Sequence, residues 1–439
     1  MADVRPIQSL HYNLAAVPSL PDVTAPPYDV ISPGMRAELL ACSPFNVVEI
    51  DLPQAPGDAD PYEHAGETLE EWTLQGILAA DREPALWALT QDYEAPDGSR
   101  RVRRGLICRV RVEDYGPGQV RPHERTQPGP REDRLRLTRA TRHNLSPIFA
   151  LHPGDAWPHL APATESEPWG EVTDADGTVH RIWRVDDPAT HDAVAAALAD
   201  SELLIADGHH RYETARTYAE EVGGEGPHRY TLACLSSLDD PGLSVFPTHR
   251  LLKGLEPGQL AELEAGLRES FDVEEVDPAA LDPAGEPGIG VFGWISGTGA
   301  AGEESQPGAN GTGETVSSAE PTRALRLRLP DDAALNPELS ERPEAYRNLD
   351  AVILETVVLK GILGMTEDDI AAKRGIGYLP SLSATAAAVG AGEWDCAFVL
   401  RSTPVQQVRN VAAAGETMPP KSTYFFPKIL TGLVFNPLS

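Results

Sequence analysis

The sequence predicts an α/β or α+β fold, and three observations lead to this prediction. Segments with alternating apolar residues, typical of strands, are interspersed with segments whose apolar residues recur at helical spacing. The apolar segment 203–206 runs directly into a glycine turn and a helical segment, an arrangement typical of mixed folds. The chain has 439 residues, of which 41% are hydrophobic, enough to bury cores in two or three structural units.

The composition argues against several classes of protein. The 36 basic and 67 acidic side chains give a formal net charge of −31, whereas nucleic-acid binding requires a basic surface. No apolar run approaches the roughly 18 residues of a membrane span, and the N-terminus has no apolar signal-peptide core. The cysteines lie far apart, which predicts reduced thiols: Cys42, Cys108, Cys234 and Cys396. We therefore expect a cytoplasmic protein without a nucleic-acid or membrane partner.

Residues 1–100 form the first predicted segment, which is α+β. Two prolines fix an extended stretch over 24–30, and a strand over 45–52, an amphipathic helix over 62–78 and a strand over 85–93 follow. The second predicted segment spans residues 101–250, and the turn 96–98 joins its first strand to the preceding one. The pattern of its apolar residues predicts strands over 101–113, 181–185, 203–206 and 228–238, with helices over 190–199 and 212–222.

Residues 251–439 form the third predicted segment, again α+β. Residues 296–322 are rich in Gly, Ser, Glu, Thr and Ala and have no apolar periodicity, which predicts a disordered insertion between strands over 290–295 and 324–329. A long apolar helix is expected over 349–363, and an apolar strand over 430–435.

The strongest candidate for chemistry is the DGHHR turn, residues 207–211. Gly208 allows a tight turn, so the unpaired N–H groups and positive end of the next helix point to one place, which suits a phosphate. Arg211 can add a bidentate donor fork, and Asp207 can hold a cation or position a hydroxyl. His209 and His210 can donate, act as acid or base, or bind a metal. The alternative is an ordinary turn with Asp207 as the N-cap and both histidines on the surface.

The DGHHR turn resembles the nucleotide-phosphate loop of the ParB/sulfiredoxin superfamily, whose free serine kinases have the same five residues. Sulfiredoxins have their catalytic cysteine where this chain has His209, so cysteine-sulfinate reduction is not expected. Over nearly the whole chain the sequence also resembles the bacterial and archaeal domain of unknown function 1015 family. The matching segments are 25–32, 46–53, 122–126, 144–149, 206–215, 247–250, 424–428 and 432–434. The resemblance implies a ParB/sulfiredoxin-like core within 101–250, elaborated by the N-terminal and C-terminal α+β segments.

The PHERT segment, residues 122–126, is the second candidate. Serine kinases of the superfamily use a glutamate upstream of the phosphate loop as general base, so the resemblance assigns this role to Glu124. Arg125 and Arg134 are candidates for neutralising phosphate charge, and His123 is a further candidate phosphate ligand. The alternative is a solvated loop held by salt bridges, with His123 as an ordinary surface residue.

Two weaker segments complete the candidates. His249 and Arg250, in the segment 247–250, belong either to the same phosphate site or to a structural turn. Lys421 and Lys428 flank an aromatic run, where solvation at a strand edge is favoured over a phosphate contact. The sequence contains no Walker phosphate loop, dinucleotide-binding motif, zinc helix or serine elbow.

Together these residues and the resemblance imply a nucleotide-dependent phosphotransferase that acts on the hydroxyl of a small molecule. Serine is the leading candidate, because members of the family are often linked with serine-biosynthesis genes. Mg²⁺ with ADP or ATP is the expected cofactor, held by the nucleotide phosphates and one carboxylate rather than by a resident metal site. The alternatives are a nucleotide-binding regulatory protein of ParB type without kinase activity, and a phosphatase or hydrolase that acts on a phosphorylated metabolite.

Overall fold

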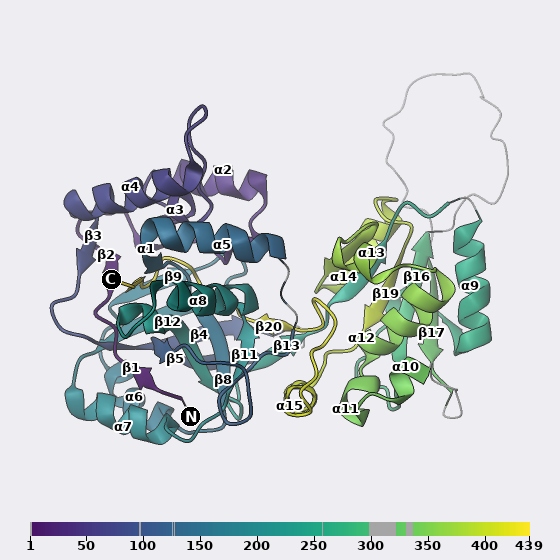
Figure 1. Ribbon diagram of the computed structural model, residues 1–439. Helices are drawn as coiled ribbons and strands as arrows, with labels where there is room; N and C mark the ends of the chain where they lie inside the picture. Colours follow the sequence, from purple (N-terminus) through teal and green to yellow (C-terminus); the bar gives the residue numbers. More distant parts are fainter. Residues whose placement is uncertain are drawn as a thin grey trace. The chain divides into compact units, whose positions relative to one another are not determined.

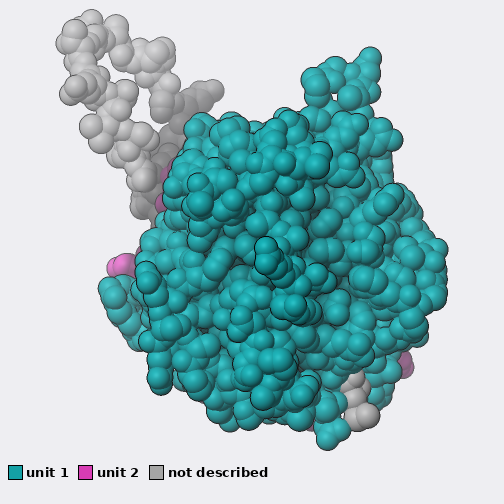
Figure 2. Space-filling model, turned by 90° about the vertical axis from the view of Figure 1, so that its left-hand side faces the viewer, with its two compact units in different colours: residues 1–244, 425–439 teal, residues 245–424 magenta. Residues whose placement is uncertain are grey.

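The computed structural model describes residues 2–95, 98–124, 126, 128–256, 258–297, 322–330 and 337–439. It is a mixed α/β protein with two compact units, one formed by residues 1–244 and 425–439 and the other by residues 245–424. Figure 2 gives both stretches of the first unit the same colour. Strands β13 (Ser244–Phe246) and β20 (Tyr424–Phe426) carry the chain out of the first unit and back into it. The second unit is therefore inserted into the sequence of the first, and the three-part division predicted from the sequence stays a prediction.

A nine-stranded mixed sheet forms the centre of the first unit (Figure 1), with the order β6-β11-β8-β12-β5-β4-β10-β9 and β1 paired with β5. Strand β8 is parallel to β12 and antiparallel to β11. The strands are β1 (Val4–Arg5), β4 (Leu86–Glu94), β5 (Arg100–Arg111), β6 (Val120–Arg121), β8 (Ile148–His152), β9 (Gly170–Thr173), β10 (Val179–Val185), β11 (Leu203–Asp207) and β12 (Tyr230–Ser237). Two short pairs lie outside this sheet: β2 (Leu10–Tyr12) with β3 (Leu78–Ala80), and β7 (His143–Asn144) with β21 (Asn436–Pro437).

Helices pack against this sheet and against one another. Helix α5 packs against both α4 and α8 in Figure 1. The helices of the first unit are α1 (Leu20–Val23), α2 (Pro33–Cys42), α3 (Val48–Asp51), α4 (Pro61–Leu74), α5 (Pro128–Thr141), α6 (Trp157–Leu160), α7 (Pro188–Leu198) and α8 (His209–Val222). Buried side chains of α6, α7 and α8 share one core with the strands, and this core includes Tyr212 of α8, Leu198 of α7 and Ile205 of β11. This packing fixes the start of α8 against the end of β11.

Most of the predicted elements are present in the first unit. Strands β4 and β5 pair antiparallel as predicted, although residues 96–97 of the expected turn lie outside the described part of the chain. The predicted strand over 45–52 is wrong, because Val48–Asp51 form helix α3. Asn46 begins this helix by accepting a hydrogen bond from the backbone N–H of Val48 at 3.0 Å, while its amide donates to the carbonyl of Thr24 at 3.0 Å. A short apolar run fits a buried helix as well as a strand.

The second unit contains a six-stranded sheet with the order β15-β17-β16-β19-β14-β18. Its strands are β14 (His249–Leu252), β15 (Asp272–Val276), β16 (Val291–Gly297), β17 (Thr322–Arg328), β18 (Ile376–Leu379) and β19 (Cys396–Leu400). Its helices are α9 (Gln259–Ser270), α10 (Pro337–Ser340), α11 (Glu344–Arg347), α12 (Asp350–Ile353), a π-helix (Leu354–Ile362), α13 (Glu367–Ala371), α14 (Leu382–Gly390) and α15 (Val405–Ala413).

Three further predictions can be compared with the structure. The helix predicted over 349–363 is confirmed as α12 and the π-helix that continues it. Residues 298–321 of the predicted insertion lie outside the described residues, and the flanking β16 and β17 pair antiparallel. The strand predicted over 430–435 is reduced to single bridges, from Thr431 to Ala25 and from Phe435 to Leu10. Among the helices that the structure describes, none has the length and apolar character to cross a bilayer.

Candidate functional site

The DGHHR turn connects a buried strand to a helix, as predicted. The first four residues of β11 are buried and Asp207, the last, is half-buried. Gly208 adopts the left-handed conformation with φ of 88°, and α8 begins at His209. The first helical bond runs from the N–H of Tyr212 to the carbonyl of Gly208 at 3.0 Å, and no side chain caps this helix. His210, which is half-buried, lies in the first turn of α8. The N–H groups of a helix's first turn make no hydrogen bonds within the helix.

The carboxylate of Asp207 lies between two cations. Nη2 of Arg211 donates to Oδ2 of Asp207 at 2.7 Å, and Nζ of Lys428 donates to Oδ1 at 3.1 Å. Nη1 of Arg211 also donates to Oγ of Ser146 at 2.6 Å and to the carbonyl of Pro147. These bonds fix the guanidinium beside the start of α8. Two cations and one carboxylate leave a net positive charge at a helix N-terminus, which is the environment that a phosphate requires.

Lys428 contacts Asp207, although its sequence context favours a solvated strand edge. It belongs to the C-terminal stretch of the first unit, so only the tertiary fold places it beside Asp207. Its side chain is 16% exposed, which contradicts the favoured interpretation as a solvated strand edge. The one signal in the sequence was the scarcity of lysine, because the chain has five lysines in 439 residues.

The PHERT segment contacts the DGHHR turn through two histidines. The backbone N–H of His123 donates to Nε2 of His209 at 3.3 Å, and the two rings meet edge to face with centroids 4.7 Å apart. Nδ1 of His123 lies 2.6 Å from the carbonyl of Ile205, and therefore carries the proton that it donates. Burial lowers the pKa of His123 to about 4, so this ring is neutral near pH 7. The structure thus brings the two sequence motifs together, and Glu124 follows directly after the residue that joins them.

Arg134 lines a small cavity together with Arg211. Nη1 of Arg134 donates to Oδ1 of Asp51 at 3.1 Å, and its guanidinium lies 4.2 Å from the ring centroid of Tyr28. Asp51, Arg134 and Arg211 line a cavity of about 40 Å³. Burial raises the pKa of Asp51, an effect that the two arginines oppose, and burial raises the pKa of Tyr28 to about 12.

Two buried polar atoms of this cavity lack partners among the described residues, Oδ2 of Asp51 and Nε of Arg211. A buried acceptor and a buried donor are each costly to leave unpaired, so both atoms favour a polar ligand beside them. The sequence does not indicate Asp51 as a site residue, since the pattern over 45–52 predicts a strand and not the helix α3.

Three predicted site residues lie outside the described part of the first unit. His249 and Arg250 belong to the second unit, where Nδ1 of His249 accepts from the N–H of Leu400 at 3.2 Å. Arg250 donates to the carbonyl of Lys421 at 3.0 Å in the same unit. These contacts bind strands and loops of the second unit to one another. Arg125 lies outside the described residues.

The arrangement has the donors that an anion requires. Within the described ranges, no three His, Cys, Asp or Glu side chains converge as a metal site. The donors that do converge are the guanidinium of Arg211, the ammonium of Lys428 and the first turn of α8. Such a group of donors neutralises phosphate oxygens and stabilises charge as it develops on them.

Comparisons with known proteins give a family and several remote structural neighbours. The model of the family described as Protein of unknown function (DUF1015) matches residues 4–351. No curated protein matches the sequence. A structure of a free serine kinase in complex with AMP is 14% identical, with a TM-score of 0.36 over 72% of this chain and 89% of that one. A conserved hypothetical protein from Pyrococcus furiosus is 15% identical, with a TM-score of 0.35 over 72% and 92%. SbnI with a C-terminal truncation, from Staphylococcus aureus, is 11% identical, with a TM-score of 0.34 over 74% and 85%.

Proposed function

The chain belongs to the family described as Protein of unknown function (DUF1015), and within it we propose that this protein is a nucleotide-dependent phosphotransferase. Its acceptor is the hydroxyl of a small molecule, with serine as the leading candidate. One observation carries the proposal: the carboxylate of Asp207 holds Arg211 and Lys428 together at the N-terminus of α8. We further propose that residues 101–250 form a ParB/sulfiredoxin-like core and that the protein works in the cytoplasm.

The roles of the residues follow from their positions. The nucleotide phosphates bind to the first turn of α8, where Arg211 and Lys428 neutralise them. Glu124 takes the proton of the acceptor hydroxyl, whose oxygen then bonds to the transferred phosphorus as the bond from phosphorus to the nucleotide oxygen breaks. Asp207 is a positioning residue, because both of its oxygens already contact the two cations. Of the two histidines in the turn, we assign to His210 the role of stabilising charge on the transferred phosphoryl group.

His209 and His123 have a supporting role in this proposal. Nε2 of His209 accepts the backbone N–H of His123, so this nitrogen cannot donate to a phosphate. The pair instead joins the segment of Glu124 to the DGHHR turn. Mg²⁺ would be bound to ADP or ATP. Its ligands would be mainly phosphate oxygens and water, as is usual for this ion.

Calorimetric titration of the whole protein with ATP, ADP and CTP in the presence of Mg²⁺ tests the proposal. We expect one nucleotide to bind the wild type, and Arg211→Ala to lose this binding. The matched control is Arg216→Ala. Arg216 lies on the same helix as Arg211 but pairs with Asp114 instead of Asp207. Failure of every nucleotide to bind the wild type would overturn the proposal.

A second measurement identifies the reaction. The protein is incubated with the nucleotide that binds and with serine or other hydroxyl compounds, and the phosphorylated product is detected by ³¹P nuclear magnetic resonance. Nucleotide binding without transfer to any hydroxyl compound would instead favour a regulatory nucleotide-binding protein. Release of phosphate from phosphoserine without a nucleotide requirement would favour a phosphatase.

A further inference from the structure

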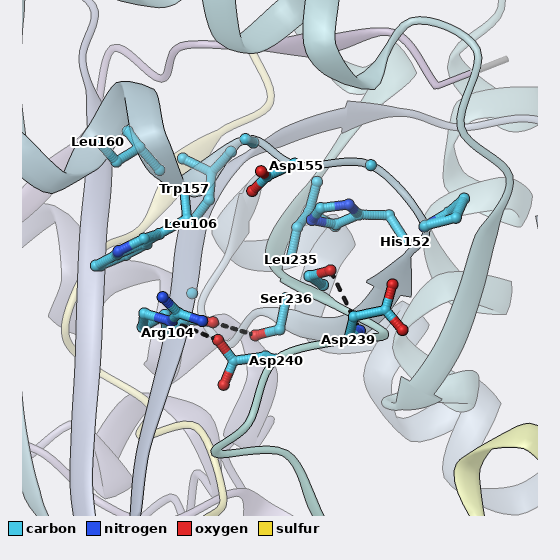
Figure 3. A pocket seen from close by; sticks show the side chains of 15 residues that line it. Arg104, Leu106, His152, Asp155, Trp157, Leu160, Leu235, Ser236, Asp239 and Asp240 are labelled. Carbon is cyan, nitrogen blue, oxygen red and sulfur yellow. Dashed lines mark hydrogen bonds and ion pairs between the residues drawn. The ribbon is translucent and has the colours of Figure 1, made fainter.

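A second, larger cavity of about 280 Å³ lies at the opposite end of β8 from the DGHHR turn (Figure 3). Strand β11 runs antiparallel to β8, and Asp207 at its end pairs with Phe149 near the start of β8. The cavity instead adjoins His152, the last residue of β8, where the parallel strand β12 also ends. The carboxyl ends of two neighbouring parallel strands thus meet at this cavity, a common position for ligand sites in α/β proteins.

The imidazole of His152 is buried and lacks a hydrogen-bond partner at one nitrogen. The residue is 3% exposed, and its Nδ1 has no partner among the residues that the structure describes. In Figure 3 the ring of His152 and the side chain of Arg104 face the cavity from opposite sides. Burial lowers the pKa of His152 to about 4, an effect that the contact of the ring with the backbone of Gly154 and the charge of Asp155 oppose, so the ring is neutral near pH 7. A buried polar atom without a partner costs about 1–3 kcal/mol, which a ligand's polar group would recover.

The charges that face the cavity favour a positive ligand. Nε of Arg104 donates to Oδ2 of Asp240 at 2.7 Å, and Oδ1 of Asp240 accepts from the N–H of Gly242 at 2.9 Å, so this ion pair is satisfied internally. Asp155 and Asp239 are exposed at the rim, and neither carboxylate makes a hydrogen bond or salt bridge with any other described side chain. The lining therefore keeps two uncompensated negative charges, which attract a cation and repel phosphates and carboxylates.

The remaining wall is apolar. The side chains of Leu106, Leu160 and Leu235 line the cavity together with Trp157, whose ring lies 5.8 Å from the guanidinium of Arg104. Apolar and aromatic walls with a few polar groups are typical of sites for small organic molecules. An indole face also attracts a ligand ammonium group.

We propose that this cavity binds a small organic cation with an apolar body, such as an alkylamine or arylalkylamine. The ammonium group pairs with Asp155 and Asp239, and the apolar body packs against Leu235 and Trp157. A second polar group of the ligand, which the simple amine probe lacks, satisfies Nδ1 of His152. This site is separate from the DGHHR turn and does not depend on the phosphotransferase proposal.

Three isosteric probes test the class of ligand by calorimetric titration of the whole protein. They are 2-phenylethylamine, which is a cation near neutral pH, the neutral 2-phenylethanol, and the anion phenylacetate. We expect the amine to bind about fivefold more tightly than the alcohol, which is ~1 kcal/mol, since its ammonium pairs with two exposed carboxylates and each such ion pair is weak. Phenylacetate should not bind.

A double variant assigns the preference to the rim. Asp155→Asn with Asp239→Asn should bring the affinities of the amine and the alcohol to within about twofold of each other. The matched control is Asp58→Asn with Glu67→Gln, which removes two exposed carboxylates of the same unit outside the cavity and should keep the preference. Absence of amine binding, equal affinities for the amine and the alcohol in the wild type, or an unchanged preference in the rim variant would each overturn the proposal.

Discussion

Lys428 and Asp207 are 221 residues apart in the chain, yet Nζ of the lysine lies 3.1 Å from Oδ1 of the aspartate. The backbone beside this contact is fixed by buried side chains of the sheet. Nε2 of Gln91 donates to the carbonyl of Lys428 at 2.9 Å, and Arg103 donates to the carbonyl of Pro427. The DGHHR turn thus has a second cation that is held in place by the core and not by the turn itself.

Replacing Lys428 by alanine should weaken nucleotide binding by at least about tenfold, which is about 1.4 kcal/mol. The reason is the loss of one charge-assisted hydrogen bond to the phosphates from a site that is mostly buried. Calorimetric titration measures the change. Arg184→Ala is the control, because it removes a partly buried cation of the same unit that pairs with Asp81 instead, and it should leave the affinity unchanged. An unaltered affinity of Lys428→Ala would remove Lys428 from the site.

Replacing Glu124 by glutamine should lower the rate of phosphoryl transfer by at least about 100-fold, because an amide cannot accept the proton of the hydroxyl. Nucleotide affinity should stay within about twofold of the wild type. Single-turnover kinetics together with calorimetry separates the two effects. The control Glu132→Gln replaces an exposed glutamate of α5 and should change neither quantity. Joint loss of binding and turnover in Glu124→Gln would contradict the assignment of the base.

Replacing Gly208 by alanine should cost about 1–2 kcal/mol of the free energy of unfolding, since a left-handed residue with a Cβ is strained. The added Cβ would lie 3.0 Å from Nε of Arg211, so nucleotide binding should also be lost. Gly223, at the other end of α8, provides the matched control. It has φ of 68°, and a Cβ there meets no atom within 4 Å. Because its ψ of 170° places Gly223 in a region that essentially only glycine adopts, Gly223→Ala should lower stability at least as much and keep the binding. Parallel loss of binding in both variants would exclude a local role of Gly208.

The stability of the protein should fall as the pH decreases from about 6.5 to about 4. Burial lowers the pKa of His123, His152 and His249 to about 4, whereas a histidine in the unfolded chain titrates near ~6.5. Between these values the unfolded chain binds more protons, so each histidine lowers the free energy of unfolding by up to about 1.4 kcal/mol per pH unit. Above about pH 6.5 both states are neutral at these groups, and their contribution is constant.

Urea unfolding at several pH values measures this slope. His123→Asn keeps a donor for the carbonyl of Ile205 and removes one titrating group, so it should reduce the slope. Gln8→Asn, at an exposed position, removes no titrating group and should leave the slope unchanged. Identical slopes for the wild type and His123→Asn would show that His123 is protonated as readily in the folded protein as in the unfolded chain.

The local part of the site could be predicted from the sequence. Gly208 between an apolar run and a polar helical segment specifies the turn from β11 to α8 through neighbouring residues alone. The same kind of evidence failed over 45–52, where the apolar pattern fits two structures. There Asn46 accepts from the nearby N–H of Val48 and also donates to the carbonyl of Thr24, a contact that spans 22 residues.

The distant part of the site could not be predicted in this way. Asp51, Lys428 and Arg211 come from three separate regions of the chain, and nothing in their own segments indicates that they meet. The contact of His123 with His209 is also a product of the tertiary fold, although both motifs were recognisable. Candidate functional residues can therefore be identified from their own segments of the sequence. The residues that they contact can be identified only from the tertiary structure.

The return of residues 425–439 to the first unit determines when the site is complete during synthesis. The ribosome makes the first 244 residues and then the entire second unit before it reaches Lys428. Until then the nascent chain lacks the second cation beside Asp207, and β7 lacks its partner β21. A chain that is interrupted within the second unit therefore has an incomplete phosphate site. Nucleotide binding of the proposed kind would report that translation has passed residue 428.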